Sequence, residues 1–215
     1  METCRQQNSR VFCFQEGSHA IRSLCFIACI ALSAVSRAQA PVFQITPEQS
    51  KFDFSVKASV ALEGKFEKWD ASLTFPSTDV STGVMDIKIW ADSVSTGSGM
   101  KDGKLKSKDF FNAKDDPYIT FHADKIVQTG PGTFDLPGTF TIRGVSKPET
   151  LTFTLSDMAA ARAAGEGEIK GKMAFDRKDY GMNKGIPFVT IAGRVEVIVN
   201  PKAKRVSGPP LVLKQ

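Results

Sequence analysis

The chain has 215 residues, 41% of them hydrophobic and 24% charged, and carries a formal net charge of +5 at neutral pH. Residues 1–40 hold four arginines and two acidic residues, which leaves 24 basic and 21 acidic side chains after them. So small an excess is ordinary for a soluble surface and lacks the clustered positive charge of nucleic-acid-binding domains. We therefore expect no nucleic-acid partner.

The N-terminal 40 residues have the layout of a secretory signal peptide. Arg22 precedes an apolar run of a dozen residues, Leu24 to Val35, and Ala38-Gln39-Ala40 follows as a cleavage site. The run is too short to span a bilayer, which takes about 20 apolar residues. We predict cleavage after Ala38 or Ala40 and a periplasmic location, with secretion outside the cell as the alternative.

All four cysteines lie in this leader, at positions 4, 13, 25 and 29. The exported chain therefore uses no disulfides, although it is long enough to bury a core without them. A lipoprotein anchored through Cys25 or Cys29 is less favoured, because both lie inside the apolar run. We expect one domain over residues 41–205, a flexible C-terminal tail over 206–215, and no stable membrane span in the mature chain.

From residue 51 onward, hydrophobic residues alternate with polar ones, which predicts half-buried β-strands. The first runs from Lys51 to Leu62, and "EGKFEK" around Gly64 is expected to turn the chain. The other predicted strands cover 69–75, 85–91, 119–123, 134–142, 151–155, 169–175 and 189–199. Pro137 indicates an edge or a bulge in its strand.

The stretch "TGSGMKDGKLKSKDFF", residues 96–111, interrupts the alternation and predicts a short helical insert around residues 101–113. It is not a nucleotide-binding P-loop. Ser98 stands where the first glycine is required, and Leu105 replaces the hydroxyl residue that would contact magnesium.

Eight strands joined by short turns favour antiparallel pairing, either as a closed barrel or as a two-sheet sandwich. Strands of ten or more residues favour the barrel, because sandwich strands are usually shorter. The fold class predicted is an all-β, eight-stranded antiparallel barrel with a short helical insert.

Little in the sequence indicates catalysis. His122 is the one histidine after residue 40, and it lies on the polar face of a strand. A zinc site needs several such ligands, and the paired acidic residues fall in turn-like sequence. We expect no enzyme, no catalytic residue and no metal site.

Thirteen of the 16 phenylalanines follow residue 40. Many fall on inward strand faces, where they could fill a solid core or line a cavity, since an eight-stranded barrel has room for one small ligand. Periodicity alone leaves both readings open.

Five segments resemble the YceI-like family, whose members are exported lipocalin-like barrels associated with polyisoprenoid binding. They are "SKFDFSVKA", "GKFEKWDASLTF", "DSVSTGSGMKDGKLKSKDFFNAKDDPYITF", "GTFTIRGVSKPETLTFTL" and "FDRKDYGMN". The resemblance as a whole covers Ile45 to about Arg205. The chain departs from the family pattern at Phe52 and Lys57, where many relatives carry histidine, and at Lys101, where arginine is usual.

The resemblance implies a lipocalin-like barrel whose apolar tunnel holds an isoprenoid chain, such as a polyprenyl phosphate or a quinone, for transport, storage or sequestration. No other cofactor is implied, and the protein is expected to be a monomer or a homodimer. Lys101 and Lys104 are candidates for contacting an anionic head group. The candidate lumen residues are Phe54, Val56, Phe75, Ile87, Ile89, Phe110, Phe111, Phe121, Phe140, Phe153, Met173 and Phe175.

Two alternatives stay open. The barrel could be solid-cored and act as an interaction or stress protein of the cell envelope. Less favoured is an enzyme that uses His122 on a lipid-like substrate.

Overall fold

The computed structural model describes residues 40–46, 50–59, 62–156, 169–185 and 190–213. The predicted signal peptide therefore lies almost entirely outside the described residues. The strands are β1 (Val42–Ile45), β2 (Lys51–Ala58), β3 (Leu62–Phe66), β4 (Trp69–Thr74), β5 (Val84–Trp90), β6 (Val94–Ser95), β7 (Tyr118–Ala123), β8 (Val127–Gly130), β9 (Thr133–Ile142), β10 (Val145–Leu155), β11 (Ile169–Asp176), β12 (Ile191–Asn200) and β13 (Ala203–Ser207). The helices are α2 (Gly99–Lys106) and the 3-10 turns η2 (Val80–Thr82), η3 (Ala91–Ser93) and η4 (Arg177–Tyr180).

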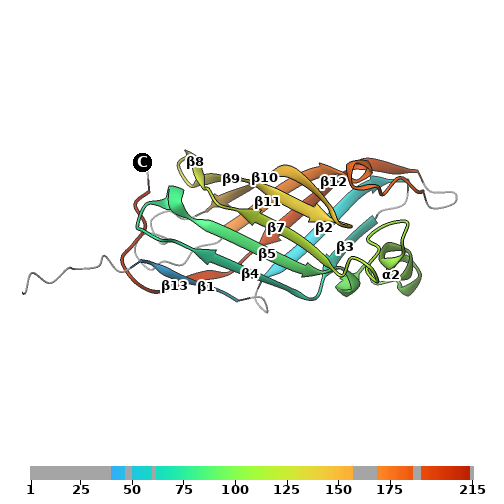
Figure 1. Ribbon diagram of the computed structural model, residues 1–215, viewed down its shortest axis with the longest axis horizontal. Helices are drawn as coiled ribbons and strands as arrows, with labels where there is room; N and C mark the ends of the chain where they lie inside the picture. The colour runs from blue at the N-terminus through green and yellow to red at the C-terminus, as the bar shows by residue number, and fades with distance from the viewer. Residues whose placement is uncertain (1–39, 47–49, 60–61, 157–168, 186–189, 214–215) are drawn as a thin grey trace, which may run out of the picture. The chain divides into compact units, whose positions relative to one another are not determined.

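The strands form one antiparallel sheet in the order β13-β1-β4-β5-β7-β9-β10-β11-β12-β2-β3-β6, and β8 pairs with β9 beside this path. The sheet curls around a common core (Figure 1). Only two residues separate β3 from β4 and β12 from β13, so each pair is one bent strand that serves different neighbours at its two ends. The prediction of an all-β antiparallel barrel with one helical insert is confirmed. The eight expected strands correspond to β2, β4, β5, β7, β9, β10, β11 and β12, and the sequence did not predict the five others, β1, β3, β6, β8 and β13.

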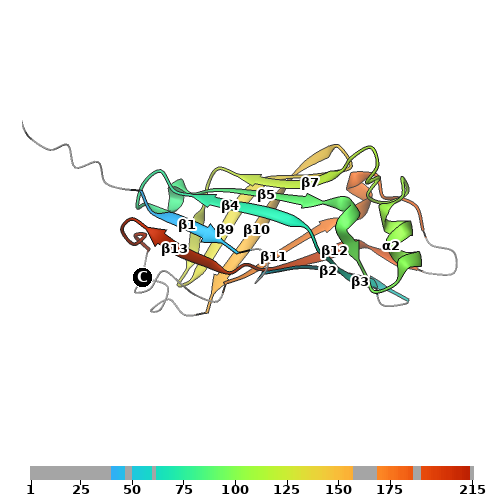
Figure 2. The same cartoon turned by 90° about the horizontal axis from the view of Figure 1, so that it is seen from below.

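The helix α2 lies beyond the strand ends at one end of the sheet, whereas β1 and β13 lie toward the other (Figure 2). Buried and exposed side chains alternate along the strands, as the predicted periodicity requires. In β5, for example, Met85, Ile87 and Ile89 are 4%, 5% and 2% exposed, while Asp86 and Lys88 face outward. The inward side chains of all the long strands meet in one hydrophobic core.

The prediction of a single strand from Lys51 to Leu62 is wrong. The strand β2 ends at Ala58, and the chain has already reversed by Leu62, which pairs with Val56. Gly64, expected in a turn, lies within β3 opposite Phe54. A Cβ at Gly64 would come within 2.7 Å of Phe54 Cζ, so this glycine makes room for an inward aromatic ring.

The helical insert starts earlier and ends sooner than expected, since α2 covers Gly99–Lys106 and turns follow it. The amide of Phe111 donates to the carbonyl of Leu105 at 2.9 Å, and the amide of Ala113 to that of Lys106 at 3.0 Å. These bonds fold the chain back after the helix and direct Phe110 and Phe111 into the core, where they are 2% and 8% exposed.

Pro137 lies in β9, where it pairs with Thr150 of β10 on one side. On its other side the partner changes from β8, which pairs with residues 133–135, to β7, which pairs with 139–141. Pro137 therefore occupies a local edge, as its missing N–H requires.

Residues 206–213, expected to form a flexible tail, make specific contacts with the barrel. Val206 and Ser207 belong to β13. The amide of Val212 donates to the carbonyl of Thr78 at 2.8 Å, and Val212 bridges Asp79. This part of the tail packs against the sheet instead of lying free.

Candidate functional site

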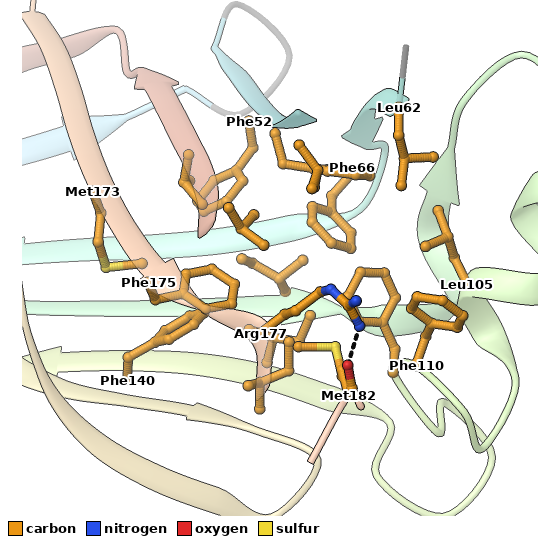
Figure 3. Close-up of a pocket in the computed structure, with 18 of the residues that line it drawn as sticks. Phe52, Leu62, Phe66, Leu105, Phe110, Phe140, Met173, Phe175, Arg177 and Met182 are labelled. Atoms are coloured by element: carbon orange, nitrogen blue, oxygen red, sulfur yellow. Dashed lines mark hydrogen bonds between the residues drawn. The ribbon is translucent and has the colours of Figure 1, made fainter. Parts of the chain in front are cut away.

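The interior of the barrel holds two apolar cavities, one toward each end. The first, of about 50 Å³, is lined by residues of β2, β11 and β12 together with Leu105, Phe110 and Phe111 from the α2 region. Figure 3 shows its phenylalanine and methionine side chains converging from opposite walls. Its volume is below that of typical small-molecule sites, about 300–1,000 Å³.

The second cavity, of about 130 Å³, lies at the β1 and β13 end. Phe43 and Ile45 of β1 contribute to it, with Met85 of β5 and Phe134 and Leu136 of β9. Leu211 and Leu213 of the C-terminal segment also line it. Every lining residue is apolar, and its size is comparable to that of an engineered apolar cavity of about 150 Å³ that binds benzene.

A waist separates the two cavities. Along β5, Met85 lines the second cavity and Ile89 the first, whereas Ile87 between them lines neither. Ile87 pairs across the strands with Phe121 of β7, which is 3% exposed and also lines neither cavity. A chain long enough to occupy both cavities would have to pass these two side chains.

All twelve candidate lumen residues are buried inside the barrel, but they do not share one space. Phe75 and Phe153 line the second cavity, and Ile87 and Phe121 form the waist between the two cavities. The remaining eight line the first cavity: Phe54, Val56, Ile89, Phe110, Phe111, Phe140, Met173 and Phe175.

The two head-group candidates, Lys101 and Lys104, lie in α2 and line neither cavity. Lys104 Nζ forms an ion pair with Asp109 Oδ2 at 2.6 Å, and the bond from Lys104 lowers the pKa of Asp109. Lys104 is thus already engaged at the helix, and any role in ligand binding stays a prediction.

The loop before α2 is fixed by Asp102. Its carboxylate accepts hydrogen bonds from the amide of Thr96 at 2.8 Å and from Thr96 Oγ1 at 2.6 Å. The hydroxyl bond is the main reason that the pKa of Asp102 lies below its ordinary value. This acidic residue therefore holds the α2 segment in place.

Arg177, which the sequence pattern did not indicate as a site residue, is 6% exposed and lines the first cavity. It follows β11 in "FDRKDYGMN", a segment with the charge content of a surface turn. Its guanidinium nitrogens donate to four backbone carbonyls, those of Met182, Lys184, Ile191 and Ala192. Figure 3 shows the bond to Met182, with the guanidinium among the aromatic side chains.

Tyr180 packs nearby against the rings of Phe140 and Phe175, with centroids 5.5 and 5.3 Å away. Its hydroxyl donates to Glu149 Oε1 at 3.2 Å. Burial, followed by the negative charge of Glu149, raises the pKa of Tyr180 well above its ordinary value. The phenol stays neutral and closes the wall of the barrel.

His122 lies on the outer face of the sheet, as predicted. Its Nδ1 is 2.7 Å from Asp86 Oδ1, and both side chains are more than half exposed. An Asp–His pair is part of a hydrolase triad, but His122 forms no other side-chain hydrogen bond with a described residue. Within the described ranges no three His, Cys, Asp or Glu residues gather as a metal site, and no helix is long and apolar enough to cross a membrane.

These features define a class of protein, a curled antiparallel β-barrel with an apolar interior. Residues 43–203 match the YceI-like domain, and the chain belongs to that family. A UPF0312 protein of Azotobacter vinelandii is 28% identical over 134 residues, which cover 58% of this chain and 66% of the relative. The match thus spans just under two thirds of the relative's length.

Two solved structures share the fold. BcnA of Burkholderia cenocepacia superposes with a TM-score of 0.64 at 23% identity, covering 74% of this chain and 99% of BcnA. A polyisoprenoid binding domain from Saccharophagus degradans, implicated in plant cell wall breakdown, superposes with a TM-score of 0.55 at 15% identity. That match covers 77% of this chain and 99% of the domain. At these identities both establish the architecture alone.

Proposed function

We propose that this protein binds a long isoprenoid lipid, of the polyprenyl phosphate or quinone type, inside its barrel, and that it transports, stores or sequesters that lipid. The observation that carries the proposal is the apolar interior, which runs through two cavities from the α2 end to the β1 end. Family membership and the polyisoprenoid binding ascribed to the Saccharophagus domain support it.

The energetics favour a long apolar ligand. Each buried CH₂ group contributes about 0.8 kcal/mol, so several isoprene units together offset the loss of freedom of a flexible tail. The cavities are small, and a long chain enters only when lining side chains change rotamer. Met173 and Met182 in the first cavity suit this, because methionine adapts its shape more readily than branched residues.

The direct test is to purify the protein from its own cells without detergent, extract it with organic solvent and identify the extract by mass spectrometry. An isoprenoid should co-purify, or geranylgeraniol should load onto extracted protein. Val197→Phe adds an aromatic ring to the wall of the first cavity and should reduce loading. The neighbouring outward substitution Glu196→Gln should leave it unchanged. The proposal is abandoned if no isoprenoid co-purifies and none can be loaded.

The small cavity volumes favour a second candidate, a solid-cored interaction protein of the cell envelope. In that case the lining side chains would be the complete core and would keep their positions when lipid is added. Protein that stays lipid-free and unchanged in melting temperature with excess geranylgeraniol would support this candidate, because a ligand that binds the folded state raises that temperature.

The proposal also places the mature protein in the periplasm, after cleavage behind Ala38 or Ala40, and gives it a binding role instead of a catalytic one. The exposed position of Asp86 and His122, on the face of the sheet opposite the cavities, supports a non-catalytic role. Mass spectrometry of protein recovered from a periplasmic extract should find Gln39 or Pro41 at its N-terminus; full-length protein in the cytoplasm would contradict export.

A further inference from the structure

The segment that follows β13, residues 208–213, closes the second cavity, and we call it the C-terminal strap. Leu211 and Leu213 line the cavity, whereas Val212 between them is 67% exposed. The strap lies at the end of the barrel opposite α2, where β13 and β1 lie (Figure 2). Its two leucine side chains therefore occupy the wall of an apolar space.

Few polar contacts hold the strap in place. Within the described ranges, they are the hydrogen bond from the Val212 amide to the Thr78 carbonyl at 2.8 Å and the bridge between Val212 and Asp79. Pro209 and Pro210 have no N–H to donate. The strap begins at Gly208, whose φ of +83° glycine adopts without strain. Release of the strap thus costs little hydrogen bonding.

The α2 end of the barrel is held more firmly. Arg143 donates from Nη1 to the carbonyl of Gly181 and from Nη2 to that of Lys108, which ties the turns after α2 to the end of η4. Leu105 and Phe110 in this region are 4% and 2% exposed. Both strap leucines, in contrast, are only partly buried against the core. Opening the barrel at the strap therefore disrupts fewer contacts than opening it at α2.

A lipid tail can replace the two leucine side chains. An isoprene unit is a short hydrocarbon with one methyl branch, much like the side chain of leucine. The surrounding wall is apolar and includes Phe43, Leu73 and Phe75. Because hydrophobic burial is non-directional and follows the area removed from water, an isoprenoid in this place restores the burial that the departing leucines give up.

We propose that the C-terminal strap is the entrance to the lumen. The isoprenoid displaces Leu211 and Leu213, and part of its tail takes their place in the second cavity. This proposal rests on the proposed function and deepens it, because it assigns lipid entry to the β1–β13 end of the barrel and not to the α2 end.

A disulfide that locks the strap tests the proposal. Asp79 and Val212 are paired and both exposed, and neighbouring strands lie about 4.7–4.9 Å apart, within the span of a disulfide. The natural cysteines all lie in residues 1–40, so Asp79→Cys/Val212→Cys adds one defined pair to the mature chain. Mass spectrometry verifies the bond.

Uptake of geranylgeraniol is then followed over time by mass spectrometry of the filtered protein. The oxidised variant should load about tenfold more slowly than the same protein after reduction, because the strap cannot open. Equal rates would overturn the proposal and leave lipid binding standing. Failure of the unmodified protein to take up the lipid at all would count against both.

A second pair of variants does not depend on the disulfide. Leu211→Ala/Leu213→Ala weakens the apolar hold of the strap and should speed uptake. Val212→Ala shortens an exposed side chain of the same segment and should leave the rate unchanged. Uptake that is no faster in the double alanine variant than in Val212→Ala would contradict entry at the strap.

Discussion

Gly138 offers a sharp test of the packing at the waist. It lies in β9, and a methyl group at its Cα would lie closer to the His122 carbonyl oxygen of β7 than real Cβ contacts allow. The same methyl would be 2.8 Å from Phe121 Cζ and 3.0 Å from Ala123 Cβ. Because the nearest atom belongs to the backbone of a paired strand, Gly138→Ala cannot be relieved by a side-chain rotation alone.

Overpacking of this kind costs about 1–3 kcal/mol. In a domain of this size, each kcal/mol lowers the melting temperature by about 2–4 °C. We therefore expect Gly138→Ala to melt about 2–12 °C below the unmodified protein when unfolding is followed by circular dichroism.

Gly103→Ala is the matched control. Gly103 is exposed in α2, and a methyl group there would meet nothing within 4 Å. Alanine is favoured over glycine in a helix by about 1 kcal/mol, so this variant should melt at the same temperature or slightly higher. Equal stability of Gly138→Ala and the unmodified protein would refute the close approach of β7 and β9 at the waist.

Three further substitutions test other parts of the structure. Phe121→Ala should join the two cavities, lower stability by about 3–5 kcal/mol and raise the affinity for geranylgeraniol relative to farnesol; an unchanged ratio in competition binding would argue against the waist. Leu211→Asp places a charge at the rim of the second cavity, so chemical denaturation should show a loss of stability and amide exchange at Val212 should speed up; unchanged exchange would mean that the segment does not depend on this contact. Asp109→Asn removes the ion-pair partner of Lys104. Because folding lowers the pKa of Asp109, the ion pair adds a small stabilisation of the folded protein at pH values above the unfolded pKa of about 3.9. That stabilisation is lost as the pH falls through the pKa of the folded state. Melting curves should therefore differ at pH 7 and coincide near pH 2, and a difference that persists at pH 2 would contradict the ion pair as its source.

Alternation in the sequence predicted the strands and their buried faces because half-buried strands impose a period of two on their side chains. It failed between Lys51 and Leu62, where apolar residues keep the period across the reversal of the chain. The alternation also led to a wrong prediction for Gly64. From sequence alone, a glycine that makes room for a neighbouring ring such as Phe54 cannot be distinguished from a glycine in a turn.

The sequence predicted the architecture of the candidate site less completely than it predicted the fold. The residues of the lumen could be predicted from periodicity, but their division into two cavities depends on how Phe121 and Ile87 pack across β5 and β7. The burial of Arg177 depends on the backbone carbonyls of Met182, Lys184, Ile191 and Ala192, which lie 5 to 15 residues further along the chain. The leucines of the C-terminal segment follow Gly208, Pro209 and Pro210, a composition typical of loose chain, yet they line a cavity.

The methionines provide the most direct test of lipid binding in the lumen. Met173 and Met182 line the first cavity and Met85 the second, whereas Met100 is 88% exposed on α2 and serves as an internal control. With the methionine methyl groups labelled with ¹³C, an NMR titration with geranylgeranyl phosphate should shift the Met173 and Met182 signals saturably and leave the Met100 signal in place. A titration that moves Met100 alone, or none of the four, would contradict binding inside the barrel.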